Sequence, residues 1–102
     1  MGTVVYLVID VLKPYDPPLV DFAERIEEAD AVERVAVNVL ERDDEVQNVE
    51  VSLQGEDIDQ DRITEIVENQ GASVHSVDQV VCGQPLDGLE RLISDRPSAG
   101  HE

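Results

Sequence analysis

The order of apolar patterns along residues 3–83 constrains the fold of this chain more than any other feature. Residues 3–12 form a nearly continuous run of β-branched and other apolar side chains, as expected of a central strand covered on both faces. Apolar residues at helical spacing follow in 19–29, and strict alternation predicts a strand around 35–39. The pattern then repeats as a strand at 49–53, a helix that begins after Asp57 or Asp59 and ends at Gly71, and a strand at 73–82.

This order of strand, helix and strand, given twice, predicts an α+β fold. Its usual compact form is the ferredoxin-like βαββαβ sandwich, a four-stranded antiparallel sheet of order 4-1-3-2 with two helices on one face. The strands at 3–12 and 49–53 are then central. We expect the ferredoxin-like domain to occupy residues 1–83, with Asp16 capping the first helix, and a short amphipathic helix and a disordered tail to follow in 84–102.

The charge of the chain limits its partners. Among 102 residues there are 24 acidic and 7 basic ones, a formal net charge of -17. Such a surface repels nucleic acid and anionic membranes, and it is typical of a protein from a salt-rich cytoplasm, where ions screen the self-repulsion. Cys82 is the only cysteine, the apolar run at 3–12 is too short to span a bilayer, and no basic leader precedes it, so we expect a cytoplasmic protein.

An acidic string at 57–61 imitates a calcium-binding loop. Asp57, Asp59, Asp61 and Glu68 stand at the ligand positions 1, 3, 5 and 12 of such a loop, but Arg62 stands where a glycine is required. We therefore interpret these acids as the cap and first turn of a helix, where the helix dipole favours negative charge.

A second group of polar residues should meet on the sheet face that carries no helices. If the strands at 3–12 and 73–82 are antiparallel neighbours, Asp10, Ser76 and Asp78 point to that face, beside Asn48 and Glu50. Carboxylate and amide oxygens suit Ca²⁺ or Mg²⁺, so Asp10 and Asp78 are the predicted metal ligands. His75 has the opposite parity and would join them only through a strand bulge. The alternative is a solvated or interface-paired patch.

Lys13, the only lysine, lies where the first strand meets the first helix. An anion such as a phosphate could be held there between Lys13 and His75, at the helix N-terminus, with Ser76 close by. The alternative for Lys13 is a salt bridge to a neighbouring acid.

The helix-free face should also present an apolar strip of Val4, Tyr6, Val8 and Val80, which is too apolar to remain in water. A second subunit would cover it and make the protein a homo-oligomer. The rival cover is the expected C-terminal helix, with Leu86, Leu89, Leu92 and Ile93.

Three strings carry a family resemblance: VIDVLKP at 8–14, GEDID at 55–59 and HSVDQVVCG at 75–83. In this order they resemble the archaeal family of unknown function number 211. The resemblance implies a ferredoxin-like fold, homo-oligomeric assembly, divalent-cation binding and, with the acidity, a haloarchaeal source; it carries no activity. The positions that it singles out are Asp10, Lys13, His75, Ser76 and Asp78. The family usually has His after its DVLKP string, where this chain has Tyr15.

Three hypotheses about function follow. The leading one is a non-catalytic, homo-oligomeric module that binds a divalent cation or a small ligand, in a regulatory role. The second is a structural module that serves assembly and binds no ligand. The third is a small enzyme that uses His75 with Asp10 or Asp78; no nucleophile with an evident base and no glycine-rich phosphate loop supports it.

Overall fold

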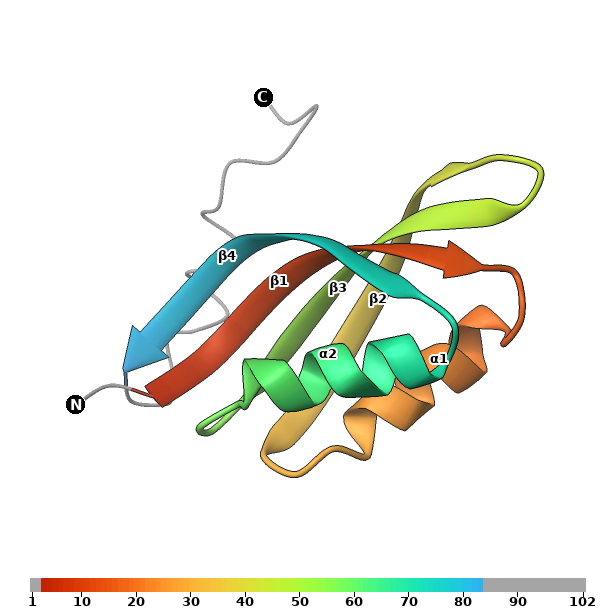
Figure 1. The fold of residues 1–102 in the computed structure, drawn as a ribbon. Coiled ribbons are helices and arrows are strands. Elements are labelled where there is room, and N and C mark those ends of the chain that lie inside the picture. Colours follow the sequence, from red (N-terminus) through yellow and green to blue (C-terminus); the bar gives the residue numbers. More distant parts are fainter. Residues whose placement is uncertain (1–2, 84–102) are drawn as a thin grey trace.

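The computed structural model of the protein describes residues 3–83, which form four strands and two helices (Figure 1). In chain order these elements are β1 (Thr3–Pro14), α1 (Leu19–Glu27), β2 (Val32–Arg42), β3 (Val46–Gly55), α2 (Gln60–Asn69) and β4 (Ser73–Gly83). The expected short helix and tail at 84–102 lie outside the described residues. Among the described helices, neither is long and apolar enough to cross a membrane.

The four strands form one antiparallel sheet in the order β2-β3-β1-β4. Read from the other edge, this is the predicted order 4-1-3-2, with β1 and β3 in the centre. Both helices lie against the same face of the sheet, α2 beside α1, as Figure 1 shows. The ferredoxin-like α+β arrangement predicted from the sequence is therefore confirmed.

The core lies between the sheet and the two helices. Leu7, Ile9 and Val11 point toward the helices at every second position of β1, as the two-residue period of a strand requires. Phe22 and Ile26 of α1, four residues apart, close this core from the other side and are fully buried. The rest of the buried cluster consists of Val49, Val51, Leu53, Ile58, Ile63, Val67 and Ala72.

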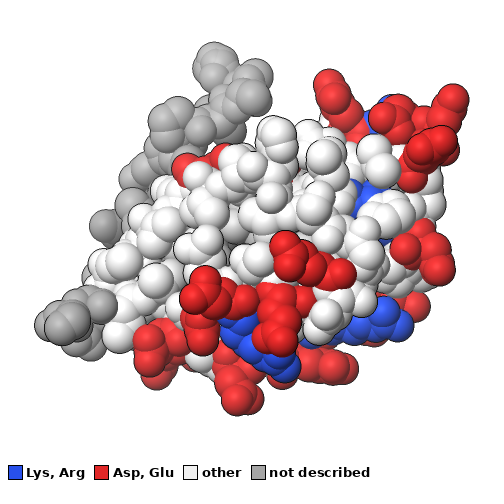
Figure 2. Space-filling view, in the orientation of Figure 1, with Lys and Arg blue, Asp and Glu red and all other residues white. Residues whose placement is uncertain are grey.

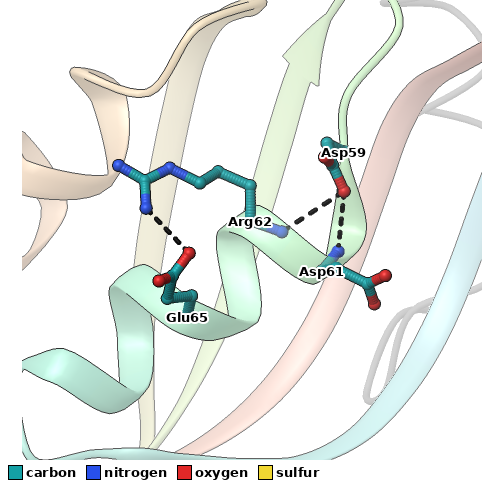
Figure 3. Close-up of polar contacts among 4 residues, drawn as sticks. All are labelled: Asp59, Asp61, Arg62 and Glu65. Carbon is teal, nitrogen blue, oxygen red and sulfur yellow. Dashed lines mark hydrogen bonds and ion pairs between the residues drawn. The ribbon is translucent and has the colours of Figure 1, made fainter.

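The two helices begin differently. Asp59 caps α2, because its carboxylate accepts hydrogen bonds from the backbone N–H groups of Asp61 (3.0 Å) and Arg62 (3.3 Å), and Arg62 pairs with Glu65 at 2.8 Å (Figure 3). This confirms the helix-capping interpretation of the acidic string. The prediction for α1 was wrong: its N-cap is Pro18, with no side-chain cap, so Asp16 is not the capping residue.

Irregularities in the pairing of β1 with β4 change which side chains share a face. Register shifts lie between Val8 and Ile9 and between Asp10 and Val11, so Asp78 and His75 are the extra residues of β4. Beyond the first shift Val80 pairs with Leu7 and therefore lies on the helix side, which corrects the expectation that it faces away. Val4 likewise packs against the helix-side core, past a further irregularity between Val4 and Tyr6. Of the expected strip, Tyr6 and Val8 point to the helix-free face, and both are buried.

Candidate functional site

The helix-free face brings His75 next to Asp10 through the bulge in β4. Asp10 pairs with Ser76, and Val11 pairs with Val74, so His75 has no partner of its own across the ladder. In a bulge of this kind two residues of one strand oppose one residue of the other, which turns the extra side chain toward the same face. His75 and Asp10 accordingly line one pocket. A bulge was the condition that the sequence set for His75 to join this group.

Asp10 is held by its neighbour on β3. The Asn48 amide donates one hydrogen bond to Asp10 Oδ1 at 2.5 Å and another to the Val11 carbonyl oxygen at 3.3 Å. Asp10 also pairs with Glu50 across β1 and β3, as predicted from the strand order. The hydrogen bond to Oδ1 thus fixes the orientation of the Asp10 carboxylate. The other oxygen, Oδ2, accepts no hydrogen bond from residues 3–83.

Asp78 and Ser76 form a separate pair on β4. The Ser76 hydroxyl donates to Asp78 Oδ1 at 2.8 Å, and Asp78 is exposed. Within the described part of the chain no three His, Cys, Asp or Glu side chains are placed to hold one metal ion. The predicted ligands Asp10 and Asp78 thus share a face, and a cation at either one would need water, amide or second-subunit oxygens to complete its shell.

The pocket at Asp10 crosses the sheet. It has a volume of about 210 Å³ and is open to solvent. β1 supplies Asp10 and Leu12, β3 supplies Val46 and Asn48, and β4 supplies His75. The remaining lining residues lie at the end of β2 and in the turn that follows it: Glu41, Arg42 and Asp43. The residues that line the pocket are therefore three acids, one arginine, one histidine, one asparagine and two apolar residues.

The sequence reading missed the contribution of the β2–β3 turn. Asp43 Oδ1 accepts hydrogen bonds from the backbone N–H groups of Val46 and Glu45, each at 2.9 Å, and these bonds lower the pKa of Asp43 below its usual value. The Tyr15 hydroxyl donates to the Asp43 carbonyl oxygen at 2.5 Å and ties the turn to the loop after β1. The only available signal was the charged string at 41–45, which in so acidic a chain indicates nothing specific.

Lys13 lies apart from this pocket. It is fully buried on the helix side of β1, where its ammonium donates to the carbonyl oxygens of Pro14 (2.8 Å), Pro17 and, more weakly, Tyr15 (3.5 Å). Burial lowers the pKa of Lys13, and the nearby charge of Asp16 partly opposes that shift. The structure thus does not bring Lys13 and His75 into one site, and the ammonium binds the chain's own loop.

Comparison with known proteins places the chain among archaeal relatives. The family model for domain of unknown function 211, described as an uncharacterized ArCR family, matches residues 5–96. An uncharacterized protein of Methanocaldococcus jannaschii, MJ0319, is 37% identical over 90 residues, which cover 88% of this chain and 93% of that protein. The chain therefore belongs to the domain of unknown function 211 family, as its three sequence strings suggested.

Proposed function

We propose that this protein is a non-catalytic, homo-oligomeric module that binds a small polar ligand or a divalent cation in the pocket at Asp10, and that binding serves a regulatory role. The observation that carries the proposal is the pocket itself, in which the β4 bulge sets His75 beside an Asp10 carboxylate already oriented by Asn48. A concave site with a few convergent polar groups is the usual form of a ligand site. Of the ligand-binding residues proposed from the sequence, His75 lines this pocket, and Ser76 is the partner of Asp10 across β1 and β4.

A divalent cation is the first ligand to test. Ca²⁺ or Mg²⁺ would bind the free oxygen of Asp10, with Asp78 on the same face as the other proposed acidic ligand. A cation that binds only the folded chain raises its melting temperature. We expect millimolar Ca²⁺ or Mg²⁺ to raise it in chelator-treated protein beyond an equal ionic strength of NaCl.

Matched variants test whether Asp10 and Asp78 cause this rise in melting temperature. Asp10→Asn and Asp78→Asn should each reduce the shift, whereas Asp21→Asn, an equal change of charge on the exposed face of α1, should leave it intact. If the shift is equal in all four proteins, the cation acts as a general counterion, and binding at Asp10 and Asp78 is excluded.

The surface of β4 supports the proposal of assembly. Among the Asp, Glu, Lys and Arg residues of the chain, β4 contains Asp78 alone. Val77 and Val80 lie on the helix side of this edge strand, and their side chains are 40% and 47% exposed. Figure 2 shows carboxylates around α1, α2 and the β2–β3 hairpin, while the area over β4 is mostly uncharged. Two copies of so acidic a chain meet with the least repulsion there.

Light scattering tests this interface. The wild-type mass should be a multiple of 11.3 kDa, and Val80→Glu should lower it. Val20→Glu on α1, where the side chain is 66% exposed, is the control that should leave the mass unchanged. A monomeric wild-type protein would refute the assembly. An oligomer that binds no ligand would favour the structural module instead.

The acidity supports a salt-rich cytoplasm as the working environment. A net charge of -17 on 102 residues destabilises the compact state by self-repulsion, which salt screens over a Debye length of about 3 Å near 1 M. The melting temperature should therefore rise steeply when the KCl concentration is raised from about 0.1 M to about 2 M. A flat response would speak against adaptation to salt.

A further inference from the structure

Three apolar side chains on the sheet face opposite the helices are buried. Val5, Tyr6 and Val8 of β1 are 2%, 2% and 1% exposed, yet they lie outside the core cluster between the sheet and the helices. Tyr6 and Val8 point away from that core by the alternation of β1. Val5 is the extra residue of the irregularity before Tyr6, and a bulge sets such a residue on the same side as its neighbour. We call these three residues the Tyr6 patch.

The burial of the Tyr6 patch requires a cover. Both helices lie on the opposite face of the sheet, and no other helix or strand of residues 3–83 lies over the patch (Figure 1). Side chains stand roughly perpendicular to a sheet, so on an uncovered face their ends reach water. The cross-strand neighbours of Val8 are Ser52 and Gln79, which are too polar to replace an apolar layer. A further apolar element is therefore needed on this face.

The chain continues from the edge of the same patch. β4 ends at Gly83, which pairs with Thr3, so residues 84–102 begin about 10 Å along β1 from Tyr6. Gly83 has a φ of +145°, which residues with a side chain rarely adopt. The chain can therefore leave the line of β4 at this residue.

The sequence after Gly83 has the apolar pattern that a cover needs. Four aliphatic residues recur at helical spacing and share one side of a helix: Leu86, Leu89, Leu92 and Ile93. The family model matches residues 5–96 and so includes all four of them. A helix this short is not stable alone in water, and packing its apolar side on a sheet is what stabilises it.

The segment is long enough to cover the patch. From the level of Gly83 to Val8 the sheet extends about 17 Å, since each residue of β1 advances about 3.3 Å. Residues 84–85 span about 7 Å when extended, and a helix of residues 86–93 adds about 12 Å. The helix can thus lie along β1 from Val5 to Val8.

A segment of the same chain is a better cover than a second copy. Residues 84–93 contain two acids, Asp87 and Glu90, and one base, Arg91, which gives a net charge of -1. A second copy would bring a charge of -17 to a face that already carries Asp10 and Asp78. Docking within one chain also avoids the entropy that two molecules lose on association.

We propose that residues 86–93 form a helix that packs on the helix-free face, with its four aliphatic side chains over the Tyr6 patch. The sheet then lies between two helical layers. This docking is independent of ligand binding at Asp10. It also leaves free the assembly proposed through Val77 and Val80, because those side chains lie on the other side of β4.

Fluorescence quenching of Tyr6 tests the docking. The chain has two tyrosines and no tryptophan, so in a Tyr15→Phe variant all the tyrosine emission comes from Tyr6. Acrylamide should quench it severalfold less than it quenches N-acetyltyrosinamide. Leu89→Asp in this background should raise the quenching severalfold, because a carboxylate cannot enter an apolar contact without a large cost. Ser94→Asp places the same charge on the polar side of the segment and should change nothing. Quenching that is unaffected by Leu89→Asp would overturn the proposal.

The oligomeric state shows which chain supplies the cover. Light scattering of the Leu89→Asp variant should give the wild-type mass, and the quenching of Tyr6 should not change on dilution. A lower mass, or quenching that rises on dilution, would mean that a second copy covers the Tyr6 patch, and the proposal would be wrong.

Thiol reactivity gives a test that does not depend on the stability of the Asp variant. In a Cys82→Ser background, Leu89→Cys should react with iodoacetamide about tenfold or more slowly than Ser94→Cys, because only an undocked segment exposes it. Equal rates in the folded protein would show that the segment is free and would refute the docking.

Discussion

The ammonium of Lys13 lies 5.6 Å from the centre of the Phe22 ring, so the side chain of the only lysine in this acidic chain packs inside the domain. Its other contacts are the carbonyl oxygens of the loop that leads into α1 and the Gln47 side chain at 3.4 Å. Lys13 therefore joins β1, β3 and the start of α1 through one charged group.

Replacing Lys13 by Met should destabilise the fold. The change keeps most of the aliphatic volume but removes the donors, which leaves loop carbonyl groups without a partner; we expect a loss of about 2 kcal/mol in the free energy of unfolding. Urea denaturation measures it, with Arg25→Met on the exposed face of α1 as the control that should cost little. A Met variant as stable as the wild type would mean that the desolvation cost of Lys13 cancels its hydrogen bonds.

The stability of the fold should depend on pH through the same lysine. Burial holds the pKa of Lys13 in the folded protein below its ordinary value of 10.5. Between these two pKa values the unfolded chain binds a proton that the folded chain has lost, so raising the pH stabilises the fold in that window. The unfolding free energy of the wild type, relative to Lys13→Met, should rise with pH up to about 10.5 and fall again as the pH is lowered. A difference that is constant over this range would contradict a lowered pKa.

Gly55 at the end of β3 should not tolerate a side chain. A Cβ atom at this position would lie 1.8 Å from the Ala31 carbonyl oxygen, and this contact involves backbone, which cannot rotate away. We expect Gly55→Ala to cost about 3 kcal/mol or more, beyond the usual range for added methyl groups. Thermal unfolding measures the loss.

Gly71→Ala provides the comparison for that variant. Its φ is +86°, but its nearest neighbour would be Pro14 Cγ at 3.8 Å, so the cost should be only the backbone strain of about 1–2 kcal/mol. A loss at Gly55 no larger than the loss at Gly71 would show that the Ala31 carbonyl group can move aside, because Gly55, unlike Gly71, has no positive φ.

The cap of α2 gives a fourth prediction. Asp59→Ala removes the acceptor for the Asp61 and Arg62 N–H groups and should cost about 1 kcal/mol, whereas Asp59→Asn keeps an acceptor and should cost less. Chemical denaturation of the two variants measures the difference. If Asp59→Asn is as unstable as Asp59→Ala, the charge at the helix N-terminus matters more than the hydrogen bonds.

The fold could be predicted from the sequence because its signals are local. The alternation in β2 and β3, the helical spacing around Phe22 and Ile26, and the helix end before Gly71 each depend on a few neighbouring residues. The side-by-side placement of Asp10, Ser76 and Asn48 also followed, since strand order and parity imply it. The start of α1 was misplaced because Asp16 is followed by two prolines, and Pro18 rather than Asp16 occupies the cap position.

The bulges in β4 could not be predicted, and they decide the site. A bulge depends on how β4 pairs with β1, a strand about 70 positions earlier in the chain, and not on the sequence of either strand alone. One bulge turns His75 toward Asp10, and the other moves Val80 to the helix side. Arg42 was missed for a similar reason, because only the assembled sheet brings the end of β2 to the same pocket as Asp10.

The sequence by itself thus determined the order of elements, the antiparallel topology, the acidic character and the family of this protein. Only the tertiary structure decided that Lys13 is buried, that His75 joins Asp10 and that Arg42 lines their pocket. The physical reason is that periodicity and capping arise within one segment, whereas strand register and the burial of a charge depend on hydrogen bonds between segments far apart in the chain.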